Sequence, residues 1–431
     1  MSGVVIKMGI YGLVRTTGLF AELPLAWGAT VLALGAVAAF FGVIFALSQH
    51  DLKRLLAYHS IENIGIILLG LGLAMVGRSL GRADWVVLGM AGCLFHVWNH
   101  ALFKSLLFFG AGSVVHATGS RDIEQMGGLA RRMPATATLF LAGAIAICGL
   151  PPFNGFVSEL LVYLGLVRAA VATPGAPSAA WVAVAAPVLA ATGALAVACF
   201  VKVTGIVFLG TPRSAAAREA HESPLPMLLP MAVLAAVCAL LGFAPILIAP
   251  ALERATAVWA GGAADGGGGQ ALPALAALVP FGGLSLGAVA LVALAGLLAA
   301  AVLPVCRRGR QRQGDLPTWD CGFAAVGSSP RVQYTGSSFA GWITSSFAWA
   351  LRPHERLPQI DRLFPAAARF DSHVEDTVLD RFLQPAGRFA LAGTAWFRSL
   401  PQGQLQRYIV YILAVLVPLL VWAVAGGAAL P

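Results

Sequence analysis

The chain has 431 residues, of which 58% are hydrophobic and only 11% are charged, and its mean hydropathy is +0.82. This composition is typical of a polytopic membrane protein and excludes a chain made only of ordinary soluble domains. The net charge of +9 does not indicate nucleic-acid binding, because the arginines lie beside apolar segments, where membrane topology explains them.

Runs of about 20 apolar residues predict about nine transmembrane helices. They fall near residues 3–19, 25–48, 55–76, 85–117, 134–170, 181–210, 225–250, 279–305 and 408–428. We therefore expect an all-α polytopic membrane protein. No signal-peptide pattern precedes the first span, and Met1 lies almost inside it.

The fifth span is interrupted by the run Gly149-Leu150-Pro151-Pro152-Phe153-Asn154-Gly155, and Glu159 follows one turn later. Paired prolines cannot continue an α-helix. Within a bilayer such a break is tolerated only where it is buried in protein or lines a wet cavity. Transporters place ion sites at discontinuous helices. A plain proline kink is the alternative, but the nearby glutamate favours an ion site.

The basic residues divide unequally between the two sets of alternating loops. One set contains Lys53, Arg54, Arg121, Arg131, Arg132, Arg213, Arg218 and the arginine-rich residues 306–407, whereas the other contains Arg15, Arg78, Arg82, Arg168 and Arg254. By the positive-inside rule the first set is cytoplasmic. We therefore expect a cytoplasmic N-terminus and a periplasmic C-terminus.

Residues 306–407 differ from the rest of the chain because they mix aromatic and aliphatic residues with arginine, for example over residues 361–388. This pattern predicts cytoplasmic amphipathic helices that lie along the membrane face or against a partner protein. A solvated linker is the alternative. The glycine-rich residues 260–269 are expected to form a flexible loop on the outer side.

Only four of the 28 basic residues are lysines, and Lys7, Lys104 and Lys202 lie in strongly apolar stretches. An ionisable group at membrane depth costs at least ~2.5–3.5 kcal/mol, so each is a candidate functional residue. Unlike arginine, a buried lysine can release its proton. Snorkelling to the membrane surface is the alternative for Lys7 and Lys202.

His96, His100 and Lys104 follow one another at intervals of four residues, which places them on one face of a helix, about 12 Å from end to end. Such a row could pass protons through intervening water molecules. Structural hydrogen bonding and zinc binding by the HxxxH pair are the alternatives, although no third zinc ligand is evident nearby.

Two carboxylates complete the set of candidates. Glu159 is the only carboxylate in its apolar stretch, which favours a proton-exchange site, with Lys104 as a plausible cationic partner. Glu62, one turn beyond His59, is a secondary candidate together with Lys202. Alternatively, Glu62 could form hydrogen bonds that hold helices together. The chain has no CxxC spacing and no dinucleotide-binding fingerprint, so we expect no disulfide framework, metal, cofactor or redox site on it.

Several runs resemble the antiporter-like proton-translocating subunits of respiratory complex I, Mrp antiporters and membrane-bound hydrogenases. They are residues 6–13 (IKMGIYGL), 51–58 (DLKRLLAY), 100–108 (HALFKSLLF), 126–129 (MGGL) and 150–159 (LPPFNGFVSE). Residues 58–70, 318–323 (TWDCGF) and 331–335 (RVQYT) are most similar to the hydrogenase-4 and formate hydrogenlyase branch of that family.

The resemblance implies two inverted five-helix repeats, each with a broken helix, followed by extra C-terminal helices. Residues 1–22 would be the last helix of the first repeat, and residues 23–211 the second repeat with its broken helix at 134–170. Residues 212–305 would add two transmembrane helices, 306–407 the cytoplasmic segment and 408–431 a final helix. Lys7 would be the central lysine, His96, His100 and Lys104 would carry the proton onward, and Glu159 would be the terminal site.

Family members carry most of the first repeat, with a glutamate and a lysine of the input half-channel, before the position where this sequence starts. We therefore expect an incomplete or truncated chain without the N-terminal half and its input path. The resemblance implies a proton-translocating membrane subunit of a redox-driven complex in the bacterial inner membrane. Its partners would be other membrane subunits, and any oxidoreductase activity would belong to the whole complex. The alternatives are a component of an Mrp-type cation/proton antiporter and a non-pumping structural anchor.

Overall fold

The computed structural model describes residues 1–171, 180–261, 272–312, 333–357, 371–374, 376, 379–395 and 405–427. The helices are α1 (Met8–Thr17), α2 (Leu25–Leu47), α3 (Leu52–Ser79), α4 (Ala83–Thr118), α5 (Pro134–Ile147), α6 (Asn154–Val171), α7 (Ala180–Ala183), α8 (Ala185–Phe208), α9 (Ala215–Glu219), α10 (Leu225–Phe243), α11 (Ala249–Trp259), α12 (Leu275–Leu278), α13 (Phe281–Arg312), α14 (Gly336–Ser346), α15 (Ala348–Leu351), α16 (Gln384–Thr394) and α17 (Leu405–Gly427).

Short elements complete the described part. They are the 3₁₀ turns η1 (Val5–Lys7), η2 (Ile123–Gln125), η3 (Leu129–Arg131) and η4 (Pro245–Leu247), the π-helical turn η7 (Leu379–Leu383) and the paired strands β1 (Pro353–Arg356) and β2 (Asp371–Val374). The chain divides into two units, Met1–His373 and Val374–Pro431. The expected all-α polytopic architecture is confirmed.

Eight helices in the described part are long and apolar enough to cross a membrane: α2, α3, α4, α6, Trp181–Phe208, α10, Phe281–Leu298 of α13 and Leu405–Ala423 of α17. They match eight of the nine predicted spans. The first predicted span, 3–19, forms only η1 and the ten-residue α1. At 1.5 Å per residue, α1 covers about 15 Å, half of a hydrocarbon core.

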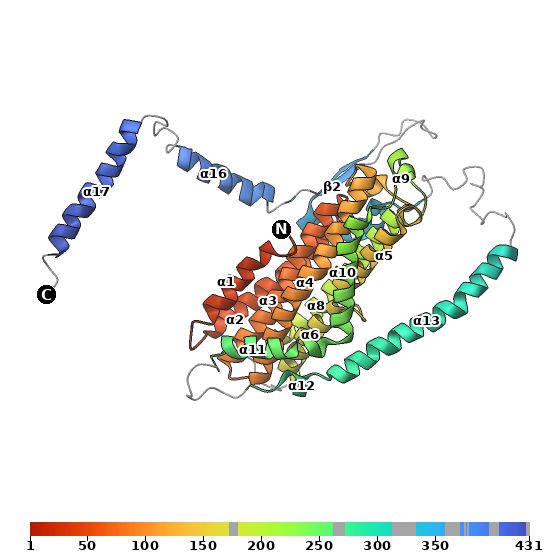
Figure 1. Ribbon diagram of the computed structural model, residues 1–431, viewed down its shortest axis with the longest axis horizontal. Coiled ribbons are helices and arrows are strands. Elements are labelled where there is room, and N and C mark those ends of the chain that lie inside the picture. The colour runs from red at the N-terminus through yellow and green to blue at the C-terminus, as the bar shows by residue number, and fades with distance from the viewer. Residues whose placement is uncertain are drawn as a thin grey trace. The chain divides into compact units, whose positions relative to one another are not determined.

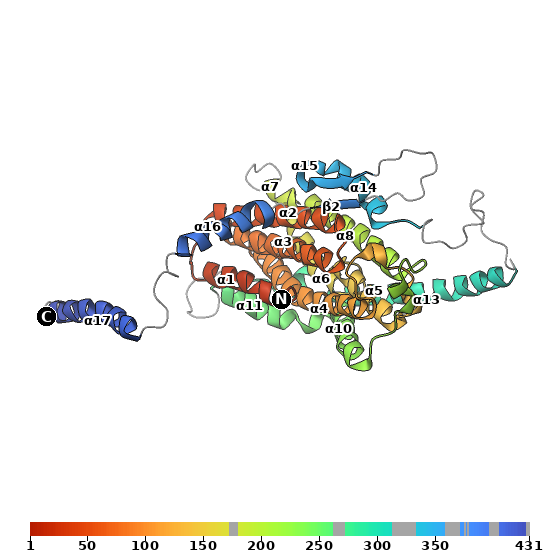
Figure 2. The same ribbon diagram turned by 90° about the horizontal axis from the view of Figure 1, so that it is seen from above.

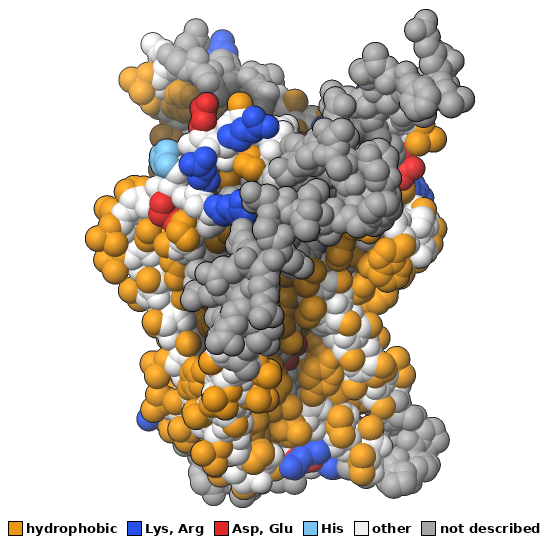
Figure 3. Space-filling view, turned by 90° about the vertical axis from the view of Figure 1, so that its right-hand side faces the viewer, with side chains coloured by type: hydrophobic (Ala, Val, Ile, Leu, Met, Phe, Trp, Pro, Cys, Tyr) orange, Lys and Arg blue, Asp and Glu red, His pale blue; other side chains and the backbone are white. Residues whose placement is uncertain are grey.

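Most helices of the first unit form a bundle with α3 and α4 at its centre, and α13 extends away from it (Figures 1 and 2). α3 packs against α2 and α4, while α4 also contacts α5, α6, α10 and α11. Figure 3 shows one face of the molecule, where hydrophobic side chains cover the middle and most of the visible charged side chains gather toward the ends. That distribution is the one a lipid-facing surface requires.

The α2–α3 contact is close because glycine lies in it. A Cβ atom on Gly42 would lie 2.5 Å from the backbone nitrogen of Glu62, so only glycine lets the two backbones approach this closely. At the start of α3, the Asp51 side chain accepts hydrogen bonds from the backbone N–H groups of Lys53 and Arg54 at 2.9 and 3.0 Å. These contacts fix where α3 begins and how deep Glu62 lies.

The break in the fifth predicted span is found where the paired prolines predict it. α5 ends at Ile147 and α6 begins at Asn154, with Pro151 and Pro152 between them. Gly149 adopts a positive φ of 60° in this connection, a conformation that glycine tolerates best.

The described residues of the segment 306–407 add two details. α13 continues as a helix through the arginine-rich run to Arg312. Strands β1 and β2 occur in the segment where amphipathic helices were expected, because α15 ends at Leu351 and a proline, which does not continue a helix, opens β1. The motifs at 318–323 and 331–332, most of the glycine-rich tract 260–269 and residues 361–370 lie outside the described residues.

Candidate functional site

The centre of the site is one face of α4, a continuous 36-residue helix. His96, His100 and Lys104 are each 0% exposed. Their common face lies inside the bundle, where α4 packs against α3 and α6. The structure therefore places all three predicted residues in the protein interior.

His96 connects α4 to both neighbouring helices. Its Nε2 lies 3.1 Å from Oδ1 of Asn63 on α3, and its Nδ1 lies 2.9 Å from Oγ of Ser158 on α6. Because the Asn63 amide nitrogen donates to the His59 carbonyl at 2.7 Å, its oxygen is left to accept from His96. Nδ1 of a neutral His96 would then accept from the Ser158 hydroxyl.

Ser158 could accommodate a second proton on His96. Its hydroxyl can also donate to the Gly155 carbonyl, 3.0 Å away, while accepting a hydrogen bond from His96. Rotation of one hydroxyl therefore provides partners for both protonation states of the ring. This geometry suits a proton carrier, and equally a structural link between helices.

Asn99 holds the start of α6 against α4. Its amide nitrogen donates to the Asn154 carbonyl at 2.8 Å and to the Ser158 hydroxyl at 3.0 Å, and its oxygen accepts from the Asn154 amide at 2.9 Å. The sequence placed Asn99 only beside the stripe. These bonds show that it fixes the helix break relative to the histidines.

His100 and Lys104 are different from His96. Within the part of the chain that the structure describes, neither ring nitrogen of His100 has a hydrogen-bond partner, and neither does Nζ of Lys104. Lys104 Nζ lies 5.8 Å from the centre of the Phe108 ring. Buried polar groups without a protein partner require water or a neutral state, because an unpaired buried charge is strongly unfavourable.

Glu62 is the carboxylate that acts on this centre. It is 1% exposed, its Oε2 contacts Nδ1 of His59, and its charge interacts with Lys104. In the sequence, His59 was only a reference point for the position of Glu62. The i, i+3 spacing of a histidine and a glutamate in an apolar helix is the signal that could have identified the pair.

Glu159 lies at the helix break, as expected, but not beside the expected cation. Its carboxylate occupies the space next to Gly149, where a Cβ atom would come within 2.6 Å of Oε2. Within the described residues no ion pair joins it to Lys104.

The remaining lysines have protein partners. Lys7 is 7% exposed and donates to the Gly3 carbonyl, and its charge acts on His96, His100 and Lys104. Lys202 of α8 is 1% exposed and donates to the carbonyls of Leu47 and Gln49 at 2.5 and 2.9 Å. Neither side chain reaches the surface as a snorkelling lysine would. No group of three or more potential metal ligands occurs among the described residues.

The comparisons with known proteins agree with this architecture. Residues 1–175 match the family described as NADH:quinone oxidoreductase/Mrp antiporter, TM. The chain is 37% identical over 444 residues to hydrogenase-4 component B of Escherichia coli (strain K12), an alignment that covers 98% of this chain and 63% of that protein. It is 44% identical over 259 residues to formate hydrogenlyase subunit 3 of the same organism, with 59% and 42% coverage. The chain therefore spans less than two thirds of the length of either relative.

One solved structure supports the fold alone. A chain of the membrane-bound sulfane sulfur reductase, an archaeal respiratory membrane complex, superposes with a TM-score of 0.61 and 22% sequence identity, covering 97% of this chain and 62% of that one. A component of the Na(+)/H(+) antiporter of Bacillus subtilis (strain 168) is 32% identical over 58% of this chain and 31% of its own length. Residues 1–175 thus match the NADH:quinone oxidoreductase/Mrp antiporter transmembrane family, and nearly the whole chain is similar to hydrogenase-4 component B.

Proposed function

We propose that this chain is a proton-translocating membrane subunit of a redox-driven complex of the hydrogenase-4, formate hydrogenlyase or complex I-like type. The observation that carries the proposal is the pair His100 and Lys104, which are fully buried, have no hydrogen-bond partner among the described residues and continue the row begun by His96. Groups in that state favour bound water, and water between titratable groups conducts protons.

The path that we propose starts at Lys7, passes Lys104, His100 and His96, and ends at Glu159. The charge on Lys7 acts on Lys104, and Glu62 acts on both Lys104 and Glu159. A proton that arrives at one group therefore changes the affinity of the next group for its own proton. Distant redox chemistry in partner subunits would drive the cycle by changing the field at Lys7.

The proposed domain organisation follows the family pattern. Residues 1–22 contain the last helix of the first repeat, and 23–211 form the second repeat with its broken helix at 134–170. Residues 212–305 contribute additional transmembrane helices, 306–407 a cytoplasmic segment that docks on partner subunits, and 408–431 the last helix. The distribution of arginine supports an inner-membrane location with a cytoplasmic N-terminus and a periplasmic C-terminus.

Lys104→Ala tests the proposal directly. We expect proton uptake by inverted membrane vesicles, driven by the complex's own electron donor, to fall by about 100-fold, because a positioned proton carrier contributes about that factor. Lys53→Ala, at the partly exposed start of α3, is the matched control. Normal membrane levels of the assembled complex would show that the loss is functional. Wild-type acidification by Lys104→Ala would refute the relay.

The antiporter alternative has its own support in the similarity to the Bacillus subtilis antiporter component. If the chain exchanged sodium for protons, replacing Na⁺ by choline would abolish transport, whereas the proton pump that we propose would continue. A purely structural anchor makes a third prediction: Glu159→Gln would shift the melting temperature of the complex and leave the proton flux unchanged.

A further inference from the structure

Lys202 lies outside the proposed central path, yet it is nearly as buried as the groups in it. Its ammonium group reaches from α8 to the C-terminal end of α2, where Leu47 and Gln49 accept its hydrogen bonds. The exposed fraction of Lys202 is 1%, so the charge is screened from bulk solvent. A buried ammonium ion is energetically costly, so its two hydrogen bonds do not by themselves explain why a lysine occupies this position.

Lys202 also lines a cavity of 730 Å³ between α8 and the start of α14. The polar residues that line it with Lys202 are Arg213, Gln333, Tyr334 and Ser338. A cavity of this size accommodates many water molecules. Lys202 thus borders a space that water can fill, while its ammonium group donates to the two carbonyls at the end of α2.

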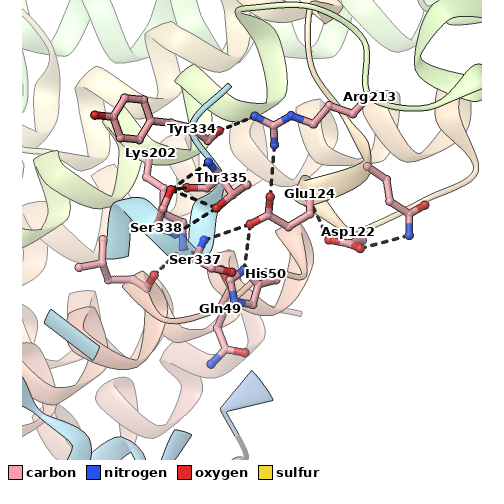
Figure 4. Close-up of polar contacts among 12 residues, drawn as sticks. Gln49, His50, Asp122, Glu124, Lys202, Arg213, Tyr334, Thr335, Ser337 and Ser338 are labelled. Carbon is pink, nitrogen blue, oxygen red and sulfur yellow. Dashed lines mark hydrogen bonds and ion pairs between the residues drawn. The ribbon is translucent and has the colours of Figure 1, made fainter. Parts of the chain in front are cut away.

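The start of α14 is held over this cavity by a set of contacts centred on Glu124 (Figure 4). Glu124 accepts from the Ser337 backbone N–H at 3.0 Å and from Arg213 at 3.2 Å, and Arg213 donates in turn to the Tyr334 carbonyl. The Gln333 side chain accepts from the Thr211 backbone N–H at 2.9 Å. Contacts from several loops therefore hold the wall of the cavity in place.

His59 connects Lys202 to the central groups. Its ring lies 4.7 Å from the ring of Phe200, which precedes Lys202 by two residues on α8. Its Nδ1 contacts the Glu62 carboxylate on α3. Titratable groups thus continue from the cavity wall to the centre of α4 through one histidine.

We propose that Lys202 is a proton-exchange group, and that it and His59 form a lateral route between the water-accessible cavity under α14 and the central row on α4. Lys202 releases one proton toward His59, His59 passes a proton on toward the central row, and Lys202 takes another proton from water in the cavity, so each group returns to its starting protonation state. This inference rests on the proposed function. In the proposed orientation the cavity opens at the cytoplasmic end, so the route delivers protons from that side.

The alternative is that Lys202 only closes the end of α2 by donating to two carbonyl groups. An arginine in the same place can also donate to these carbonyls, but it does not release its proton. Lys202→Arg therefore separates the two roles.

The first test measures proton uptake by inverted vesicles that contain the complete complex with Lys202→Arg, compared with wild type and with Lys53→Arg. We expect a decrease of at least about tenfold for Lys202→Arg alone, since a group that cannot exchange its proton cannot serve as a carrier. Wild-type uptake by Lys202→Arg would overturn the proposal. If uptake still requires Lys104, that result would leave the proposed function intact.

The second test does not depend on how well Lys202→Arg folds. Ser338→Cys places a thiol on the cavity wall, and Ser345→Cys places one on the exposed side of the same helix, α14. We expect a bulky neutral maleimide to reduce proton uptake at least about fivefold in the first variant, by filling the water path, and not in the second or in treated wild type. Equal uptake by labelled Ser338→Cys and labelled Ser345→Cys would contradict a route through this cavity.

Discussion

Lys104 and Lys202 are both buried, but they differ in their hydrogen-bond partners. Lys202 donates to two backbone carbonyls, whereas Lys104 has no hydrogen-bond partner among the described residues and faces an aromatic ring at 5.8 Å. The first arrangement stabilises the ammonium form, and the second leaves it costly. The comparison shows that equal burial does not give equal roles: the two carbonyls add a structural role to the proton exchange that we propose for Lys202, and Lys104 lacks such partners among the described residues.

The largest expected effect separates transport from stability at Lys104. Lys104→Met should reduce proton uptake by about 100-fold, because it removes the carrier. It should leave the melting temperature of the purified complex unchanged or higher, since methionine has similar length and removes an unpaired buried polar group. Thermal unfolding and vesicle acidification of the same preparation check both. A strongly lowered melting temperature would show that Lys104 has a structural partner.

Glu62→Gln should have the next largest effect. Glutamine keeps the shape of the side chain but cannot carry the negative charge that acts on Lys104 and Glu159, so we expect proton uptake to fall about tenfold. Glu219→Gln, on the exposed side of α9, is the matched control. Equal uptake by the two variants would make Glu62 polar glue between helices.

Lys202→Met should show the stability loss that Lys104→Met does not. Removal of its ammonium group leaves the Leu47 and Gln49 carbonyls without these donors, which costs about 1–3 kcal/mol for a buried acceptor. The free energy of unfolding, measured by denaturant titration in detergent beside Lys53→Met, checks this value. If Lys202→Met and Lys104→Met were equally stable, the contrast between the two lysines would fail.

Asp51→Ala should have the smallest effect. It removes the cap at the start of α3, next to the loop that contains Gln49, and we expect a loss of about 1 kcal/mol in the free energy of unfolding. Asp51→Asn keeps an acceptor for the same N–H groups and should restore most of this loss. A transport defect in Asp51→Ala with unchanged stability would show that the α2–α3 loop takes part in proton access.

Much of the fold was predictable from the sequence because it follows local patterns. Apolar runs located the long spans, and paired prolines located the break between α5 and α6. The strands β1 and β2 were not predicted, because strand pairing depends on residues distant in the chain. Of the first predicted span, the described residues form η1 and the ten-residue α1.

The candidate site, too, was predictable only where it follows local sequence patterns. The spacing of His96, His100 and Lys104 placed them on one face, and the structure shows that this face is buried. The spacing could not show that His96 bridges α3 and α6 while His100 has no partner among the described residues. Nor could it show that the Glu62 carboxylate contacts His59, or that no ion pair joins Glu159 to Lys104 among the described residues.

The sequence by itself determined the class of protein and the positions of most spans, and it supplied the candidate proton-carrying residues, because composition, periodicity and proline are local properties. Only the tertiary structure decided which buried charge has partners. Lys202 finds its two carbonyls 155 and 153 residues away, and Lys104 finds none among the described residues. Such partners depend on how the helices pack, and packing brings together residues that no local pattern relates.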